Sequence, residues 1–177
     1  MASSTADLCA ALAAYCRVHD IRISNETFFQ YLTEVEPSDG SHFPGITHLQ
    51  HLSGEVIESL PAPDDLRVLV VDCGGKVDTV DFDRAHARTI YRECPDRIRF
   101  ALNLLKSGLR NQDNKMVCRA ATISAEISQK ILFKPQFSDL LALALYHGAL
   151  GVNCAHSGTV LGVLYQENAH VQAALKN

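Results

Sequence analysis

The stretch Leu66-Arg67-Val68-Leu69-Val70-Val71, apolar at all positions but one, constrains the fold more than any other part of the chain. Strands with one solvated face alternate between apolar and polar residues, whereas a nearly continuous apolar run is typical of a strand covered on both faces. The run therefore predicts a buried central strand. A second apolar run, SGTVLGVLY at 157–165, predicts another buried strand.

Helical periodicity fills most of the remaining sequence. Apolar residues recur at spacings of three and four, which predicts helices over 4–19, from Ser24 to Pro37, and over 83–93, 96–110, 113–131, 138–147 and 168–177. Loose alternation over 46–60, with Ser53-Gly54 in the middle, indicates an antiparallel hairpin. A pattern dominated by helices, with a few strands in two regions, is typical of an α+β fold.

Residues of known capping preference lie at the predicted helix ends. Ser4, with Asp7 three residues later, fits a capping box, and Ser24 and Ser138 are predicted to begin the second and sixth helices. Gly148 is predicted to close the sixth helix. Pro61 and Pro63 interrupt the chain between the hairpin and the first apolar run, and they predict a domain boundary that gives domains 1–62 and 63–177.

The composition excludes several classes of protein. The 177 residues are 47% hydrophobic and 20% charged, which is ordinary for a globular protein, and the net charge of −4 argues against nucleic-acid binding through a basic face. No apolar run reaches the length of a membrane span and no secretory leader is evident, so we expect a cytoplasmic protein without a membrane partner. The cysteines are scattered, and they are predicted to be free thiols. His48 and His51 have no third ligand nearby, which favours surface histidines over a zinc site.

The first stretch with chemical potential is Ala2-Ser3-Ser4-Thr5 at the start of the first helix. Free backbone N–H groups at a helix start attract anions, and small residues with hydroxyl groups let a phosphate or a metal ion approach. The alternative is a plain capped helix.

The second stretch, Glu34-Val35-Glu36-Pro37-Ser38-Asp39-Gly40, places carboxylates at a helix C-terminus. Negative charge is unfavourable there, so such carboxylates can be retained to bind a cation or a proton. An ordinary Asp-Gly turn after a proline is the alternative.

The third stretch, residues 148–159, is rich in glycine and alanine and lies between a predicted helix and a predicted strand. Small residues allow close approach of a ligand or of another loop. The alternative is a tight helix-to-strand connection, although twelve residues are long for one.

Taken in order, the three stretches resemble the galactokinase, homoserine kinase, mevalonate kinase and phosphomevalonate kinase (GHMP) superfamily. Residues 148–162, GALGVNCAHSGTVLG, and residues 73–79, CGGKVDT, resemble its branch that phosphorylates L-threonine in cobalamin synthesis and propanediol utilisation. The resemblance implies a GHMP kinase-like two-layer α/β fold, in which 1–62 is the remaining part of an N-terminal ATP-binding domain. Residues 63–177 would form a ferredoxin-like C-terminal domain.

The resemblance also implies roles for individual residues. ATP phosphates would be held at Ala2, Ser3, Ser4 and Thr5, and Mg²⁺ by Ser4 and Glu36. Asp39 would orient or deprotonate the acceptor hydroxyl. The residues expected to bind the small-molecule substrate are Asp72, Gly74, Thr79, Ser157, Gly158 and Thr159.

Two features depart from the family's pattern. The proline and glycines that normally open the phosphate loop are not found upstream of Ala2, and a final strand is not evident near Asn177. The chain is therefore expected to be truncated at its N-terminus. Two alternatives stay open: a non-catalytic remnant that folds as an oligomer, such as a homodimer, and a kinase for homoserine or another small alcohol.

Overall fold

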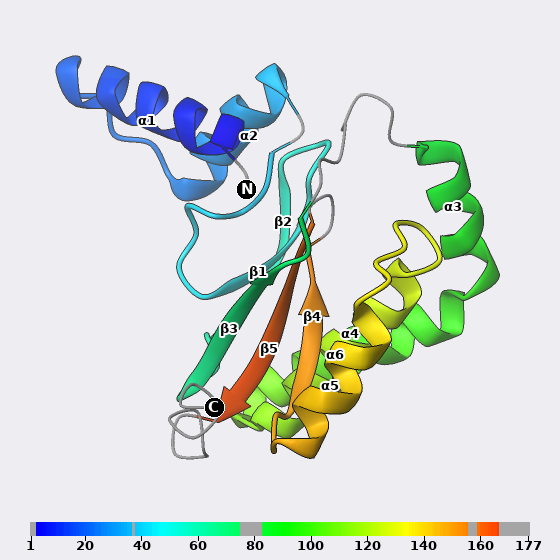
Figure 1. Ribbon diagram of the computed structural model, residues 1–177. Coiled ribbons are helices and arrows are strands. Elements are labelled where there is room, and N and C mark those ends of the chain that lie inside the picture. The colour runs from blue at the N-terminus through cyan, green and yellow to red at the C-terminus, as the bar shows by residue number, and fades with distance from the viewer. Residues whose placement is uncertain (1–2, 37, 75–82, 156–158, 167–177) are drawn as a thin grey trace. The chain divides into compact units, whose positions relative to one another are not determined.

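The computed structural model describes residues 3–36, 38–74, 83–155 and 159–166, and Figure 1 shows its ribbon. The chain forms two compact units, Met1–Ala62 and Pro63–Asn177. Each unit has its own elements and its own buried residues, and the two are described separately below.

The described residues of the N-terminal unit form two helices followed by a hairpin. Helix α1 (Ser3–Val18) is followed by α2 (Asn25–Val35), and β1 (Ile46–Gln50) pairs antiparallel with β2 (Glu55–Leu60). The hydroxyl of Ser24 accepts a hydrogen bond from the Thr27 amide at 3.1 Å, which confirms the predicted cap of α2. Phe29 and Leu32 are the buried apolar residues of α2.

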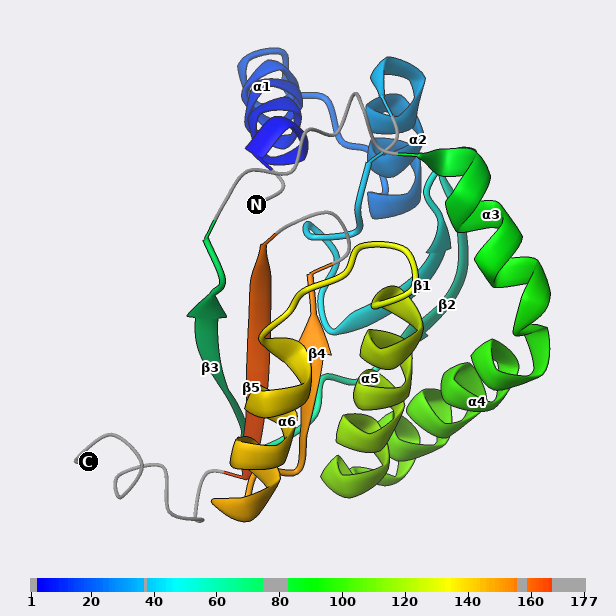
Figure 2. The same ribbon diagram turned by 45° about the vertical axis from the view of Figure 1, so that its right-hand side comes forward.

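In its described residues, the C-terminal unit combines a three-stranded sheet with four helices. Its elements in chain order are β3 (Leu66–Asp72), α3 (Arg84–Glu93), α4 (Pro95–Asn111), α5 (Asn114–Ser128), α6 (Phe137–Tyr146), β4 (Gly151–Cys154) and β5 (Val160–Gln166). The strand order is β3-β5-β4, and both pairings are antiparallel. Strand β5 is therefore the central strand, as Figure 2 shows.

The core of this unit lies between the sheet and two helices. Side chains of β4 and β5, including Val152, Leu161 and Val163, pack with Ala125 of α5 and Ala144 of α6. Helix α5 also reaches the backbone of β4 by a side chain: the Val152 amide donates a hydrogen bond to Thr122 Oγ1 at 3.0 Å. This contact satisfies a backbone N–H group in a strand that has a neighbour on one side only.

The prediction that 66–71 is a buried central strand was wrong. Strand β3 lies at an edge of the sheet, where Val68 is 50% exposed and Val70 is 64% exposed. The central position belongs to β5, which is buried from Leu161 to Tyr165. An apolar run predicts strand formation, but the order in which strands pair depends on contacts distant in sequence.

Three further local predictions need correction. Residues 151–154, assigned from sequence to a small-residue loop, form β4. Helix α6 begins at Phe137, so Ser138 is a helical residue rather than the cap, and Ser4 likewise lies inside the first turn of α1. Gly148 follows α6 with a φ of +83°, which confirms it as the residue that closes this helix.

The other helices were predicted within a few residues of their observed ends. The helix predicted over 168–177 lies outside the described residues. None of the helices that the structure describes combines the length and the apolar character needed to cross a bilayer.

Candidate functional site

In the N-terminal unit, the acidic stretch forms a hydrogen-bonded bend after α2. The Glu36 amide donates to the Leu32 carbonyl at 3.2 Å and ends the helix. The side chain of Ser38 is 2% exposed, and its hydroxyl donates to the Glu36 carbonyl at 3.1 Å. Asp39 Oδ1 accepts a hydrogen bond from the Ser41 amide at 3.0 Å. These bonds fix the backbone of the bend, while the exposed Asp39 leaves acceptor capacity for a ligand.

The carboxylate of Glu36 has the chemistry expected of a cation ligand. Its Oε1 atom is buried, and the described residues offer it no hydrogen-bond donor. A carboxylate oxygen that is shielded from water is stabilised by a cation or a proton, and Mg²⁺ prefers such oxygen ligands. Glu36 therefore fits the predicted Mg²⁺ site. Within the described ranges, no three His, Cys, Asp or Glu side chains form a group that could hold a metal ion by themselves.

Helix α1 carries two residues, Thr5 and Cys9, that bear on its relation to this bend. Thr5 and Cys9 are four residues apart, so they share a face of the helix, and Thr5 is 4% exposed. The pKa of the Cys9 thiol is raised, first by burial and then by the negative charge of Asp39. Cys9 of α1 therefore lies near enough to Asp39 for the charge of Asp39 to act on its thiol. Ala2 and the side chains of Ser3 and Ser4 lie outside the described residues.

His42 lies among aromatic rings beside the bend. Its ring centroid is 5.3 Å from that of Phe28, 5.5 Å from that of Phe29 and 4.2 Å from that of Phe43. Burial lowers the pKa of His42, although a backbone hydrogen bond at Asn25 and the charge of Asp39 act in the opposite direction. The net effect favours the uncharged imidazole, so His42 adds no positive charge beside Asp39.

In the C-terminal unit, Asp72 joins two predicted substrate-binding residues. Asp72 Oδ1 accepts hydrogen bonds from the Gly74 amide at 3.0 Å and from the Thr159 hydroxyl at 2.8 Å. These two bonds lower the pKa of the Asp72 carboxyl, with the Gly74 bond contributing most. The Cys73 amide donates to the Thr159 carbonyl at 3.2 Å and continues the pairing of β3 with β5. The result is an exposed, ionised carboxylate that can pair with an ammonium group.

The glycine-rich third stretch divides into a turn, a strand and a connection. Gly151 lies so close to α5 that an added Cβ would stand 2.5 Å from Thr122 Oγ1 and 2.6 Å from the Cys118 carbonyl oxygen. Its small size therefore serves helix–strand packing, whereas the sequence predicted close approach of a ligand or of another loop. Thr79, Ser157 and Gly158 lie outside the described residues.

One charged residue that the sequence did not indicate stands out in the structure. Lys134, in the segment between α5 and α6, is 5% exposed. Its Nζ atom is shielded from water and has no hydrogen-bond partner within the described part of the chain. A lysine followed by a proline in an ordinary connection carries no signal of such burial.

Comparison with known proteins gives a consistent result. The family described as GHMP kinases C terminal matches residues 105–177. The chain is 31% identical over 170 residues to an L-threonine kinase of Citrobacter freundii and 30% identical over 176 residues to one of Salmonella typhimurium. Residues 105–177 are therefore similar to the C-terminal part of GHMP kinases. The alignments with the two L-threonine kinases cover 96% and 99% of this chain, which spans 59% of the length of each relative.

Solved structures show that the fold is also that of GHMP kinases. A homoserine kinase from Cytophaga hutchinsonii superposes with a TM-score of 0.73 at 21% identity, over 99% of this chain and 58% of the other. The mevalonate kinase of L. major, solved with R-mevalonate, gives a TM-score of 0.72 at 14% identity, over 99% and 60%. The mixed α+β architecture predicted from the sequence is thus the architecture found in part of these kinases.

Proposed function

We propose that this chain is part of an ATP-dependent kinase that phosphorylates the hydroxyl group of L-threonine. The observation that carries the proposal is the identity of 31% and 30%, over nearly the whole chain, with two L-threonine kinases. We infer that residues 1–62 belong to the N-terminal ATP-binding domain and that residues 63–177 form a ferredoxin-like C-terminal domain, in agreement with the family match at 105–177.

The start of α1 is the proposed phosphate-binding element. The first N–H groups of a helix have no carbonyl partner within the helix, and the helix dipole adds partial positive charge there. Ala2, Ser3 and Ser4 have small side chains, which would let phosphate oxygens approach the backbone, and Thr5 lies in the first turn of α1. Glu36 and Ser4 would hold Mg²⁺, and the bound ion would neutralise charge on the phosphate oxygens.

Asp39 is the proposed catalytic residue. Its side chain is exposed, and the Ser41 amide fixes the position of one of its oxygens. The other oxygen is available to accept a hydrogen bond from the acceptor hydroxyl, which orients that hydroxyl and takes up its proton during transfer. Phosphoryl transfer depends mainly on such positioning and on charge stabilisation, so a single carboxylate is sufficient for this role.

In the C-terminal unit, Asp72 is the proposed partner of the amino group of the substrate. Gly74 and Thr159 keep its carboxylate ionised and oriented. We propose that Thr79, Ser157 and Gly158 complete the substrate-binding segments on the basis of their sequence resemblance.

The test is an assay of phosphate transfer from ATP to a panel of L-threonine, L-serine, L-homoserine and mevalonate. Asp39→Asn is expected to lower kcat by about 100-fold or more, since a positioned general base typically contributes that much. Glu36→Gln should raise the Mg²⁺ concentration at which the rate is half-maximal, because a carboxylate ligand of the ion is lost. Glu34→Gln, which changes an exposed carboxylate on the same helix, is the matched control and should leave the rate unchanged.

Full activity in the Asp39→Asn, Glu36→Gln double variant would refute the assignment of these two residues. A preference for homoserine would refute the assigned acceptor while retaining the kinase. Absence of ATP and Mg²⁺ binding by calorimetry would favour the non-catalytic alternative.

A further inference from the structure

Within the described part of the chain, Lys134 has no partner that explains its burial. Lysine is among the residues that are most rarely buried, and a buried ammonium group is normally paired with an anion or with hydrogen-bond acceptors. Here the side chain is 5% exposed, and its Nζ atom has no acceptor among the residues that the structure describes. A charged group in this situation is costly to the fold unless a ligand supplies the missing anion.

Hydrogen bonds place the backbone of Lys134 close to the end of β4. The Lys134 amide donates to Gln129 Oε1 at 2.8 Å, and Gln129 Nε2 donates to the Ala125 carbonyl at 3.3 Å. The same Nε2 atom lies 4.0 Å from the sulfur of Cys154, the last residue of β4. Gln129 thus links the Lys134 segment to the strand that leads into the connection 155–159.

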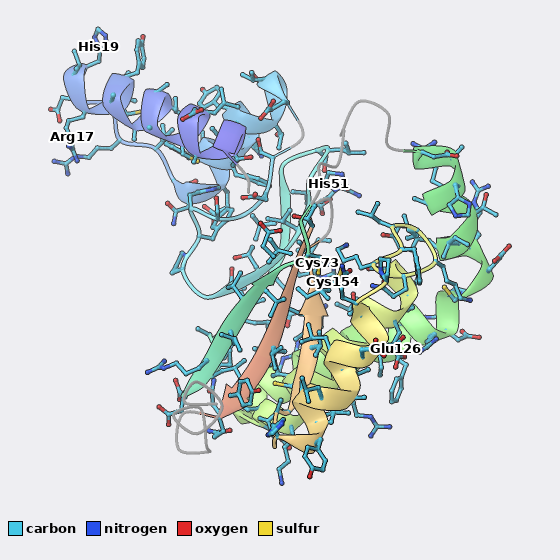
Figure 3. All side chains as sticks on the ribbon, in the orientation of Figure 1. Arg17, His19, His51, Cys73, Glu126 and Cys154 are labelled. Carbon is cyan, nitrogen blue, oxygen red and sulfur yellow. The ribbon has the colours of Figure 1, made fainter. Side chains whose placement is uncertain are left out.

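The end of the sheet that carries Asp72 is the end at which β4 stops and β5 begins. Cys154 pairs with Leu161, and Asp72 pairs with Val160, the first residue of β5. Cys73 and Cys154 pack against the same core cluster and are labelled at this end in Figure 3. Figures 1 and 2 both show the connection from α5 to α6 near the same end of β4. Lys134 and Asp72 therefore belong to the same end of the C-terminal unit.

Asp72 is not the internal partner of Lys134. Its Oδ1 atom is occupied by Gly74 and Thr159, its side chain is exposed, and no contact with the ammonium group is formed. The two residues thus offer one exposed, ionised carboxylate and one ammonium group that has no hydrogen-bond partner among the described residues. A nucleotide phosphate tail carries several negative charges and would be repelled by Asp72, whereas an amino acid carries one charge of each sign.

We propose that Lys134 binds the carboxylate of the amino-acid acceptor, which complements Asp72 as the partner of the α-ammonium group. This inference rests on the proposed function, because it takes L-threonine as the acceptor. It makes Lys134 a specificity residue, which selects amino acids over neutral alcohols, and it assigns Lys134 no part in proton transfer.

The test compares L-threonine with L-threoninamide, which keeps the hydroxyl and the amino group but has no carboxylate. In calorimetric titrations of the full chain, L-threonine is expected to bind about tenfold more tightly than L-threoninamide, because it forms one additional charge-assisted hydrogen bond. Lys134→Met should abolish this preference and Lys134→Arg should retain it. Lys130→Met, at an exposed lysine four residues earlier, is the control and should behave as the unmodified chain does.

Thermal unfolding separates ligand binding from a structural role. If Lys134 has no internal partner, Lys134→Met removes an uncompensated charge, and its Tm in the absence of ligand should be equal to or above that of the unmodified chain. A substantially lower Tm for Lys134→Met would overturn the proposal, because it would reveal a structural partner.

Three binding results would also overturn it. The first is an unchanged preference for L-threonine in Lys134→Met. The second is equal affinity of the unmodified chain for L-threonine and L-threoninamide, and the third is that the unmodified chain binds neither compound. Failure of the proposed function is a distinct result: a carboxylate preference that depends on Lys134, without phosphate transfer from ATP, would support the binding role and refute the kinase assignment.

Discussion

Replacement of Gly151 by alanine is expected to destabilise the C-terminal unit strongly, because α5 packs directly on the backbone of β4. The new Cβ would stand 2.5 Å from Thr122 Oγ1 and 2.6 Å from the carbonyl oxygen of Cys118. Neither distance is compatible with van der Waals contact. Since a backbone carbonyl in the middle of a helix cannot move by itself, β4 and α5 would have to separate.

The expected loss combines two effects. Overpacking of a filled interior costs about 1–3 kcal/mol. Separation also breaks the bond from the Val152 amide to Thr122 Oγ1, and leaving a buried donor unpaired costs about 1–3 kcal/mol. Because the two effects arise from one displacement and overlap, we expect a total of about 3 kcal/mol.

The free energy of unfolding can be measured by urea denaturation followed by far-ultraviolet circular dichroism, since the chain contains no tryptophan. Gly148→Ala is the control, because its φ of +83° is strained for alanine but, apart from the two adjacent residues, no described residue has an atom within 4 Å of the new Cβ. That variant should lose about 1 kcal/mol. In the double variant Gly151→Ala, Thr122→Ala, the loss should be smaller than the sum of the single losses, because the nearest clashing atom is gone.

A loss below about 1 kcal/mol for Gly151→Ala would refute the reasoning, since such a value is typical of an average substitution rather than of a steric clash. Strict additivity in the double variant would also contradict it. Either result would mean that β4 and α5 are not in contact at Gly151.

Two pH-dependent predictions complete the set. Thr159→Val should raise the pKa of Asp72 in a carbon-detected NMR titration, because a hydrogen bond to the carboxylate is lost. Because this pKa is lower in the folded chain than the unfolded value near 3.8, the ionised carboxylate stabilises the fold at pH values above 3.8. This contribution is lost as the pH falls through the folded pKa. An unchanged titration would contradict the bond. His42 should titrate below 6.5, so the N-terminal unit should lose stability as the pH falls below about 6.5, because the unfolded chain takes up a proton that the buried ring resists. The free energy of unfolding, measured as a function of pH, should lose this dependence in His42→Phe and keep it in His51→Gln, which changes a residue in an exposed turn. Identical pH profiles of the unfolding free energy for the unmodified chain and both variants would contradict the burial of His42.

The helices could be predicted from the sequence because their signals are local. Apolar spacing and capping residues act within one or two turns, so the Ser24 cap and the Gly148 stop are found where they were expected. Strand β4 could not be predicted, because its four residues, Gly-Val-Asn-Cys, are too few to show the alternation of apolar and polar residues that is typical of a strand. Its strand conformation is imposed by β5 on one side and by the Thr122 hydroxyl on the other.

The candidate site divides in the same way. Glu36 and Asp39 are close in sequence, so a bend that contains both carboxylates was predictable. The bond between Thr159 and Asp72 joins residues 87 positions apart, and only the pairing of β3 with β5 creates it. The burial of Lys134 depends on how its connection packs on the end of the sheet, which no local pattern encodes.

The sequence by itself determined the helices, the hairpin and the motifs typical of GHMP kinases, because each depends on neighbours within a few residues. The tertiary structure alone decided that β5 rather than β3 is central, that Gly151 serves packing, and that Lys134 is buried without a partner among the described residues. The physical reason is that strand order and burial are set by contacts between distant segments. The free energy of those contacts depends on the whole arrangement and not on the local pattern.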